Sequence, residues 1–125
     1  MNAPDRLVQG LGALRVDLPV AAAQKLQAFA ALLEKWNRTY NLTALRDARS
    51  VVSHHLLDSL AVLPYLTVES LVDVGSGGGL PGIPLALARP EWRIALVEAN
   101  LKNASFLTQG KIELGLHNVV VVRER

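Results

Sequence analysis

The chain contains no cysteine, which excludes disulfides and thiolate metal sites. No segment reaches the roughly 18 uninterrupted apolar residues that a membrane-spanning helix needs. The first residues, Met1 to Arg6, lack the basic and then apolar pattern of a secretory signal peptide. With 13 basic and 11 acidic residues, the net charge of +2 gives no argument by itself for a nucleic-acid partner. We therefore expect a cytoplasmic protein without a membrane segment.

Half of the 125 residues are apolar, which is enough for the core of one domain or part of one. Apolar residues spaced three and four apart predict an amphipathic helix from Pro19 to Tyr40. The apolar stripe of this helix consists of Leu26, Phe29, Leu33, Trp36 and Tyr40. We expect Trp36 and Tyr40 to pack in the core rather than to stack on bases. A second helix is expected to begin near Asp47 or Ser50 and to run to about Leu63, and Pro64 either ends it or marks its last turn.

The second half of the chain alternates between strand and helix patterns. Strands are predicted over residues 71–74, 93–97 and 118–122, and helices over residues 81–89 and 101–115. The third strand, Asn118 to Val122, lacks polar alternation, which is typical of a parallel strand buried on both faces. The sequence therefore predicts an α/β fold that contains half of a doubly wound parallel sheet.

The most informative segment covers residues 71–82, where five glycines follow a short apolar run. Glycines let the backbone turn tightly and approach a ligand, and the next helix offers unpaired N–H groups. A P-loop needs Gly-Lys-Ser/Thr after the glycines, but the sequence there is Leu-Pro-Gly. A dinucleotide fingerprint fails when counted from Gly75 and starts two residues late when counted from Gly77.

The pattern D-x-G-x-G-x-G fits without a gap, through Asp73, Gly75, Gly77 and Gly79, and resembles motif I of S-adenosylmethionine-dependent methyltransferases. An acid at position 73 repels phosphate and suits a ligand with a cationic or hydrogen-bond-donating head. Glu98 stands at the end of the second predicted strand, 23 residues after Gly75, where a carboxylate can accept both ribose hydroxyls of a nucleoside. This acid suits NAD and S-adenosylmethionine equally, so an NAD(P)-binding oxidoreductase domain stays an alternative.

Further segments come in order at compact spacing. They are Trp36-Asn37, Tyr40-Asn-Leu-Thr43, His55-Leu-Leu-Asp-Ser59, Pro64-Tyr-Leu66, the loop from Asp73 to Pro84, and Arg89-Pro90. Together they resemble the bacterial small-subunit rRNA guanine-N7 methyltransferase family, also called glucose-inhibited division protein B. The resemblance implies a Rossmann-like methyltransferase fold with an N-terminal helical extension, here residues 1–66, followed by the first half of the Rossmann-like domain, residues 67–125, in one structural unit.

The resemblance also implies a cofactor, a substrate and a set of site residues. The cofactor is S-adenosylmethionine, and the methyl group goes to N7 of a guanosine in 16S rRNA of the small ribosomal subunit. The cofactor contacts fall on Asp73, Gly75, Ser76, Gly77, Gly79, Leu80 and Glu98. Glu98 stands where the family commonly has Asp, and Asn103 stands after Lys102 where it often has Arg. Because N7 carries a lone pair and no proton, we expect no catalytic acid or base.

Family elements beyond the third strand do not occur within the 125 residues. We therefore expect a fragment or truncated product of a longer protein, with absent or impaired methyl transfer of its own. A non-catalytic RNA-binding fragment is a further alternative.

Basic residues gather in the segment 35–49. Lys35, Arg38, Arg46 and Arg49 against Asp47 give it a net charge of 4 − 1 = +3. This segment is either a solvated face or a set of contacts to RNA phosphates.

His54, His55 and Asp58 lie within one helical turn, but without a further ligand they are a weak signal for a metal. We expect local hydrogen bonds there and no metal site. The oligomeric state does not follow from the sequence.

Overall fold

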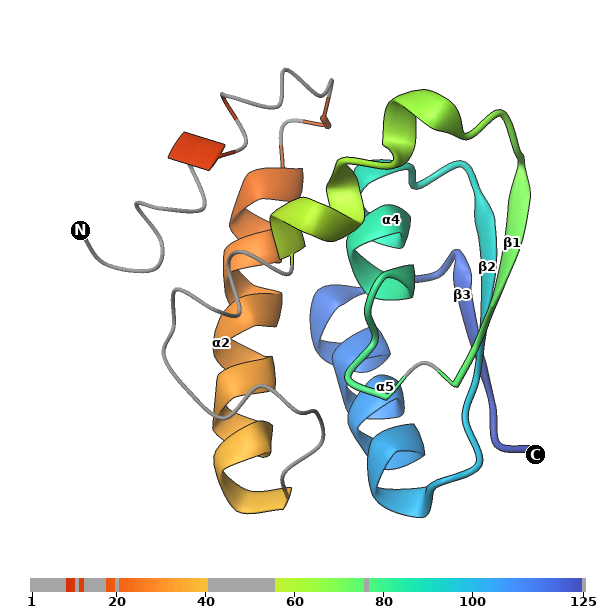
Figure 1. Ribbon diagram of the computed structural model, residues 1–125. Coiled ribbons are helices and arrows are strands. Elements are labelled where there is room, and N and C mark those ends of the chain that lie inside the picture. The colour runs from red at the N-terminus through yellow and green to blue at the C-terminus, as the bar shows by residue number, and fades with distance from the viewer. Residues whose placement is uncertain are drawn as a thin grey trace.

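The computed structural model describes residues 9–10, 12, 18–19, 21–40, 56–75 and 77–124. These residues form a three-stranded parallel sheet with helices against one of its faces (Figure 1). The strands are β1 (Ser70–Val74), β2 (Arg93–Val97) and β3 (Val119–Val122), and their spatial order is β1-β2-β3. The predicted α/β class and partial doubly wound sheet are confirmed.

Helices follow the strands as the alternating pattern predicts. α4 (Gly82–Ala88) connects β1 to β2, and α5 (Leu101–Leu114) connects β2 to β3. α2 (Ala22–Tyr40) packs on α4 and α5 from the side away from the sheet, as Figure 1 shows. The described part of the chain is therefore layered as sheet, helix pair and outer helix.

The helices begin and end where their flanking residues allow. α2 begins three residues after Pro19, because the Pro19 carbonyl accepts the N–H of Ala22 at 2.9 Å in a turn before the helix. The side-chain oxygen of Asn100 caps α5 by accepting the N–H of Asn103 at 3.1 Å. α5 ends at Leu114, and the next residue, Gly115, has a φ of 64°, a left-handed conformation that favours glycine.

The second predicted helix is described only in part. Residues 56–60 are helical, and a 3-10 helix, Leu63–Tyr65, follows them. Pro64 lies inside this 3-10 helix near its start, where a missing N–H breaks no intrahelical hydrogen bond. The expected starting residues, Asp47 and Ser50, lie outside the described residues.

The apolar stripe of α2 faces the core. The side chains of Leu26, Phe29 and Leu33 have an exposed fraction of 0%. The Trp36 ring meets Phe106 of α5 edge to face, with 5.6 Å between ring centroids, so the prediction of core packing is confirmed for Trp36. The side chain of Tyr40 lies outside the described part of the chain.

Strand register divides the sheet into two unlike faces. Leu71, Ile94 and Val119 are aligned across the sheet, and Ile94 and Val119 are buried beneath the helices. The residues that follow them point to the opposite face, which we call the bare face. It consists of Val72, Val74, Ala95, Val97, Val120 and Val122.

No described helix covers the bare face, which lies away from α2, α4 and α5 in Figure 1. Val72, Val74 and Val120 are exposed by 63%, 75% and 57%. The prediction that the third strand is buried on both faces is therefore wrong for this chain. Four consecutive valines are typical of a strand that is buried on both faces of a sheet. The described helices, however, cover only one face of this sheet.

The helical and sheet parts share one hydrophobic core. Leu26 and Leu33 of α2 belong to the same buried cluster as Ile83, Leu96 and Phe106. This continuity is compatible with one structural unit, while the division between residues 66 and 67 stays a prediction. Among the described helices, none has both the length and the apolar character needed to cross a membrane.

Candidate functional site

The glycine loop, residues 75–82, lies at the carboxyl ends of the parallel strands. The N–H of Gly75 donates to the carbonyl of Val97 at 2.8 Å, so the loop starts beside the end of β2. The loop then leads into α4 (Figure 1). Doubly wound sheets bind ligands at this edge, where the strands end and the helices begin.

The glycines of the loop serve two different needs. Gly75, Gly77 and Gly79 have φ values of 72°, 55° and 86°, in the left-handed region that favours glycine. A Cβ at Gly75 would meet no atom within 4 Å, and one at Gly77 would meet only the Gly75 carbonyl oxygen at 4.0 Å. A Cβ at Gly79 would lie 2.7 Å from Cδ1 of Ile83. Gly75 and Gly77 therefore leave open space beside the backbone, whereas Gly79 is required by packing.

Glu98 joins the glycine loop to the segment before α5. Its Oε1 accepts the N–H of Gly77 and its Oε2 accepts the N–H of Asn100, each at 2.8 Å. The residue is 8% exposed, and its own N–H donates to the Val122 carbonyl at 2.9 Å. The carboxylate is thus held at the carboxyl end of β2 with one oxygen toward each segment.

The ionised form of Glu98 is favoured in the folded protein. Burial by itself raises the pKa of this carboxyl, because it removes the charge from water. Hydrogen bonds from the backbone of Asn100 and Gly77, the side chain of Asn103 and the backbone of Ala99 outweigh burial and lower the pKa below its usual value. Glu98 is therefore an anionic acceptor at neutral pH.

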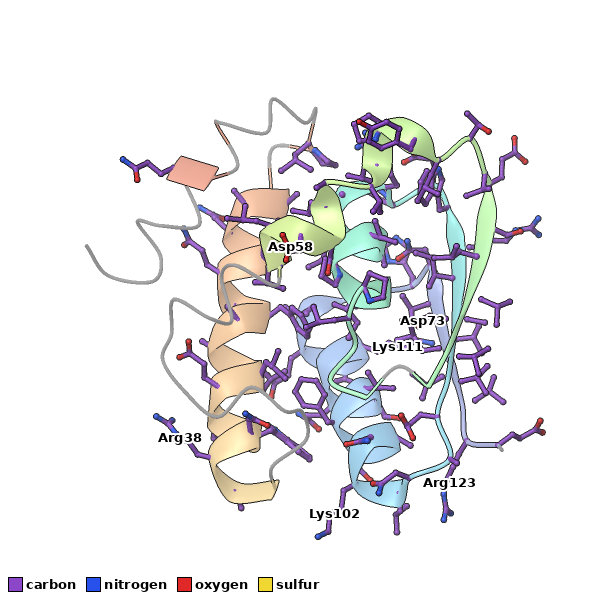
Figure 2. The ribbon with its side chains drawn as sticks, viewed as in Figure 1. Arg38, Asp58, Asp73, Lys102, Lys111 and Arg123 are labelled. Carbon is purple, nitrogen blue, oxygen red and sulfur yellow. The ribbon has the colours of Figure 1, made fainter. Side chains whose placement is uncertain are left out.

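Asp73 holds the far end of the same loop. Its Oδ2 accepts the N–H of Gly82, the first residue of α4, at 3.1 Å. The side chain is half-buried and lies on the helix-covered side of the sheet (Figure 2). The two acids that the sequence predicts, Asp73 and Glu98, are thus brought together around the loop, one at its end and one near its middle.

The remaining predicted site residues are spread more widely. Leu80 is half-buried and packs against the core, and Ser76 lies outside the described residues. Lys35 and Arg38 are exposed on the last two turns of α2. Arg46 and Arg49 lie outside the described residues, so their predicted contacts stay predictions.

Sequence reasoning missed the residues that complete the Glu98 site. Asn100 supplies both an N–H to Glu98 and the side-chain cap of α5, and the side chain of Asn103 favours the Glu98 anion. Asparagine directly before a predicted helix is a typical N-cap signal, so this part of the site was within reach of the sequence.

The structure describes only Asp58 of the histidine cluster. His54 and His55 lie outside the described residues, and Asp58 is exposed and engaged in an interaction of its own. Within the ranges that the structure describes, no three His, Cys, Asp or Glu side chains form a group that could hold a metal ion.

Comparison with known proteins gives a consistent result. A family model described as "GidB: rRNA small subunit methyltransferase G" matches residues 22–125. A "Ribosomal RNA small subunit methyltransferase G" from Nitrosospira multiformis is 51% identical over 125 residues, which cover 100% of this chain and 58% of the relative.

Proteins of the same name from two other organisms are also similar. The one from Aromatoleum aromaticum is 60% identical over 95% of this chain and 59% of its own length. The one from an Azoarcus species is 60% identical over 90% of this chain and 54% of its own length. The chain thus spans little more than half the length of these curated relatives.

Proposed function

The chain belongs to the rRNA small subunit methyltransferase G family, and from this premise we propose that it carries the cofactor-binding half of an enzyme that methylates 16S rRNA. We propose S-adenosylmethionine as the methyl donor and N7 of a guanosine as the acceptor. The observation that carries the proposal is the open backbone at Gly75 and Gly77 beside the buried, anionic carboxylate of Glu98.

The residues present fit an S-adenosyl cofactor. Gly75 and Gly77 leave space in which the amino-acid part can approach the backbone, and Glu98 offers acceptors for the ribose hydroxyls. Asp73 places negative charge near the loop, which suits a cationic amino group and disfavours phosphate. We include Ser76, Gly79 and Leu80 as further residues of this loop that border the cofactor.

The proposed reaction needs little acid–base chemistry from the protein. When bound, the cofactor supplies a methyl group on a sulfonium, which is already electrophilic. N7 of guanine has a lone pair and no proton to remove, so the residues of this chain would act by holding the donor in place for in-line transfer. We therefore assign no catalytic acid or base.

Basic side chains favour an RNA approach from the same end of the molecule. Arg38 of α2, Lys102 of α5 and Arg123 after β3 all lie toward the end at which the parallel strands finish (Figure 2). Lys35 is exposed on the same part of α2. We propose that this rim, with Arg46 and Arg49, contacts phosphates of the small ribosomal subunit. A cytoplasmic location follows from that partner.

The cofactor proposal is tested with a chimera in which these 125 residues replace the matching segment of the Nitrosospira multiformis relative. Isothermal titration should show binding of S-adenosylmethionine and no binding of NAD⁺ or NADP⁺. Preferential binding of a nicotinamide cofactor would instead support the oxidoreductase alternative.

The reaction is tested by incubating the chimera with S-adenosylmethionine and undermethylated small ribosomal subunits. Nucleoside mass spectrometry of the 16S rRNA should show new N7-methylguanosine. Methylation at another position would refute the assignment to N7 while leaving the cofactor assignment intact. The 125-residue chain, assayed in parallel, shows how much of the activity it holds by itself.

A further inference from the structure

Glu98 spans two segments that lie far apart in the sequence. Gly77 is 21 residues from Glu98, whereas Asn100 is two residues away, and both donate backbone N–H groups to the same carboxylate at 2.8 Å. Asn100 in turn caps α5 through Asn103. A continuous line of hydrogen bonds therefore runs from the glycine loop through Glu98 to the first turn of α5.

Among the described residues of the glycine loop, Gly75 and Gly77 have little packing of their own, whereas Gly78 and Gly79 are buried. Gly75 and Gly77 carry no side chains, and a Cβ at either position would find open space rather than packing partners. Glycine loses more conformational freedom on ordering than other residues, so such a loop needs fixed hydrogen bonds to keep one conformation. Among the described residues of the loop, the backbone N–H of Gly75 donates to Val97, that of Gly77 to Glu98, and that of Gly82 to Asp73.

From this geometry we infer that Glu98 is a positioning residue, which holds the glycine loop in its ligand-binding shape before any ligand arrives. This role is additional to the ribose contact, and the inference rests on the proposed function only where it concerns a cofactor. Together with the hydrogen bonds from the Asn103 side chain and the Ala99 backbone, these bonds use most of the roughly four acceptor sites of a carboxylate. A nucleoside hydroxyl that binds Glu98 would therefore take the place of one of these donors.

An ionised carboxylate suits this role better than a neutral side chain would. Hydrogen bonds to an ionised acceptor are shorter and about twice as strong as those between neutral groups. If the loop is already ordered before binding, the ligand does not have to supply the free energy that ordering requires. The affinity should therefore depend on Glu98 even for a ligand that makes no ribose contact.

The first test needs no cofactor. Amide hydrogen exchange is measured for the ligand-free 125-residue chain and for Glu98→Gln, which keeps the size of the side chain but exchanges one acceptor for a donor. Protection at Gly77 and Asn100 should fall on the order of tenfold to a hundredfold, the range that corresponds to one hydrogen bond to a charged group. Amides of Phe106 and Leu107 in α5 should keep their protection.

Glu124→Gln is the matched control, because Glu124 is an exposed carboxylate just after β3. It should leave protection at Gly77 unchanged. If Glu98→Gln does not fold, the same measurement is made on the wild-type chain at decreasing pH. Protection at Gly77, corrected for the intrinsic pH dependence of exchange, should then fall when acid protonates Glu98. Protection at Gly77 that responds neither to Glu98→Gln nor to acid would overturn the inference.

The second test separates positioning from ribose contact in the chimera. Affinity is measured for S-adenosylhomocysteine and for its 2′,3′-dideoxy form, which lacks both ribose hydroxyls. If Glu98 positions the loop, Glu98→Gln should weaken the dideoxy ligand as well, by at least about threefold. A dideoxy ligand that is insensitive to the substitution would show that Glu98 is a ribose contact alone. Failure of both ligands to bind the wild-type chimera would refute the proposed cofactor, while the exchange test of the loop would stand.

Discussion

The carboxylate of Asp73 and the backbone N–H of Gly82 are hydrogen-bonded at 3.1 Å, so β1 and the first residue of α4 are joined directly. This contact depends on the absence of a side chain at position 82. A Cβ there would lie 2.8 Å from Oδ2 of Asp73 and 2.3 Å from Cδ2 of Leu96. Both distances are too short for real contacts, so α4 can approach the sheet this closely only through glycine.

Gly82→Ala should therefore destabilise the fold. Overpacking of a tight site costs about 1–3 kcal/mol, and the Asp73 bond would be disturbed as well. Urea unfolding followed by circular dichroism measures the change. Gly110→Ala is the matched control, because a Cβ at Gly110 in α5 would meet Cδ1 of Ile83 at 3.7 Å and Cδ2 of Leu32 at 3.8 Å. It should stabilise the helix by up to about 1 kcal/mol. Equal effects of the two substitutions would contradict this account of Gly82.

Gly77→Val should abolish cofactor binding in the chimera, because the valine side chain would fill the open space beside the loop. The substitution also strains a backbone whose φ is 55°. Gly115→Val separates these two effects, since Gly115 has a φ of 64° and open space at its Cβ but lies at the end of α5. Isothermal titration should show lost affinity for Gly77→Val alone. Unchanged affinity in Gly77→Val would place the cofactor elsewhere.

Acid should weaken the fold through Glu98. Because its pKa in the folded protein is lowered, the ionised form contributes stability above the ordinary glutamate pKa of about 4.3. That contribution is lost as the pH falls through the lowered pKa. As the pH falls below the ordinary glutamate pKa, the free energy of unfolding should thus decline less steeply in Glu98→Gln than in the wild type. In Glu124→Gln, the free energy of unfolding should depend on pH as it does in the wild type. The same pH dependence in Glu98→Gln would show that the ionised Glu98 carboxylate does not stabilise the fold.

Charge reversal at Lys35 and Arg38 should weaken binding of the chimera to small ribosomal subunits. Each lost phosphate contact should reduce the slope of log affinity against log salt by about one unit. Affinity for S-adenosylmethionine should stay unchanged. Lys25→Glu is the control, because Lys25 is exposed in the first turns of the same helix, far from the carboxyl ends of the strands. An unchanged salt slope in the Lys35 and Arg38 variant would assign these residues to a solvated face.

The bare face should cause the 125-residue chain to self-associate, since it combines exposed valines with sheet edges that no described strand pairs. Val72→Lys together with Val120→Lys should lower the association measured by sedimentation velocity over a range of concentrations. Ile112→Lys is the control, because Ile112 is 67% exposed but lies on α5. Equal loss of association in the control would show that general solubility, and not the bare face, governs the effect.

Much of this fold was predictable because the relevant signals are local. The apolar spacing from Leu26 to Trp36 predicts the buried side of α2, and the strand from Arg93 to Val97 has the bounds that its sequence predicts. The start of α2 was less predictable, because the turn at Pro19 competes with the helix for the same residues. Both strand-end acids, Asp73 and Glu98, lie where the alternation of strands and helices indicates.

The partners of the acids were not predictable in the same way. That Glu98 binds Gly77 depends on a left-handed turn 21 residues earlier, which spacing alone does not specify. The exposure of Val120 depends on which segments cover the sheet, and the composition of β3 carries no information about them. Local pattern thus indicates which residues gather at the site, while their contacts depend on the conformation of the loop between them.

The strand order β1-β2-β3 has a consequence for how the chain is made. Every strand of this sheet pairs with its neighbour in the sequence, and the paired residues Ser70 and Arg93, or Ile94 and Val119, are only 23 and 25 positions apart. Each pairing therefore closes a loop that contains a single helix, and this loop costs less entropy to close than the longer loop between non-neighbouring strands would. A nascent chain leaving the ribosome can consequently add each strand to the growing sheet as it emerges, with α4 and α5 docking in turn.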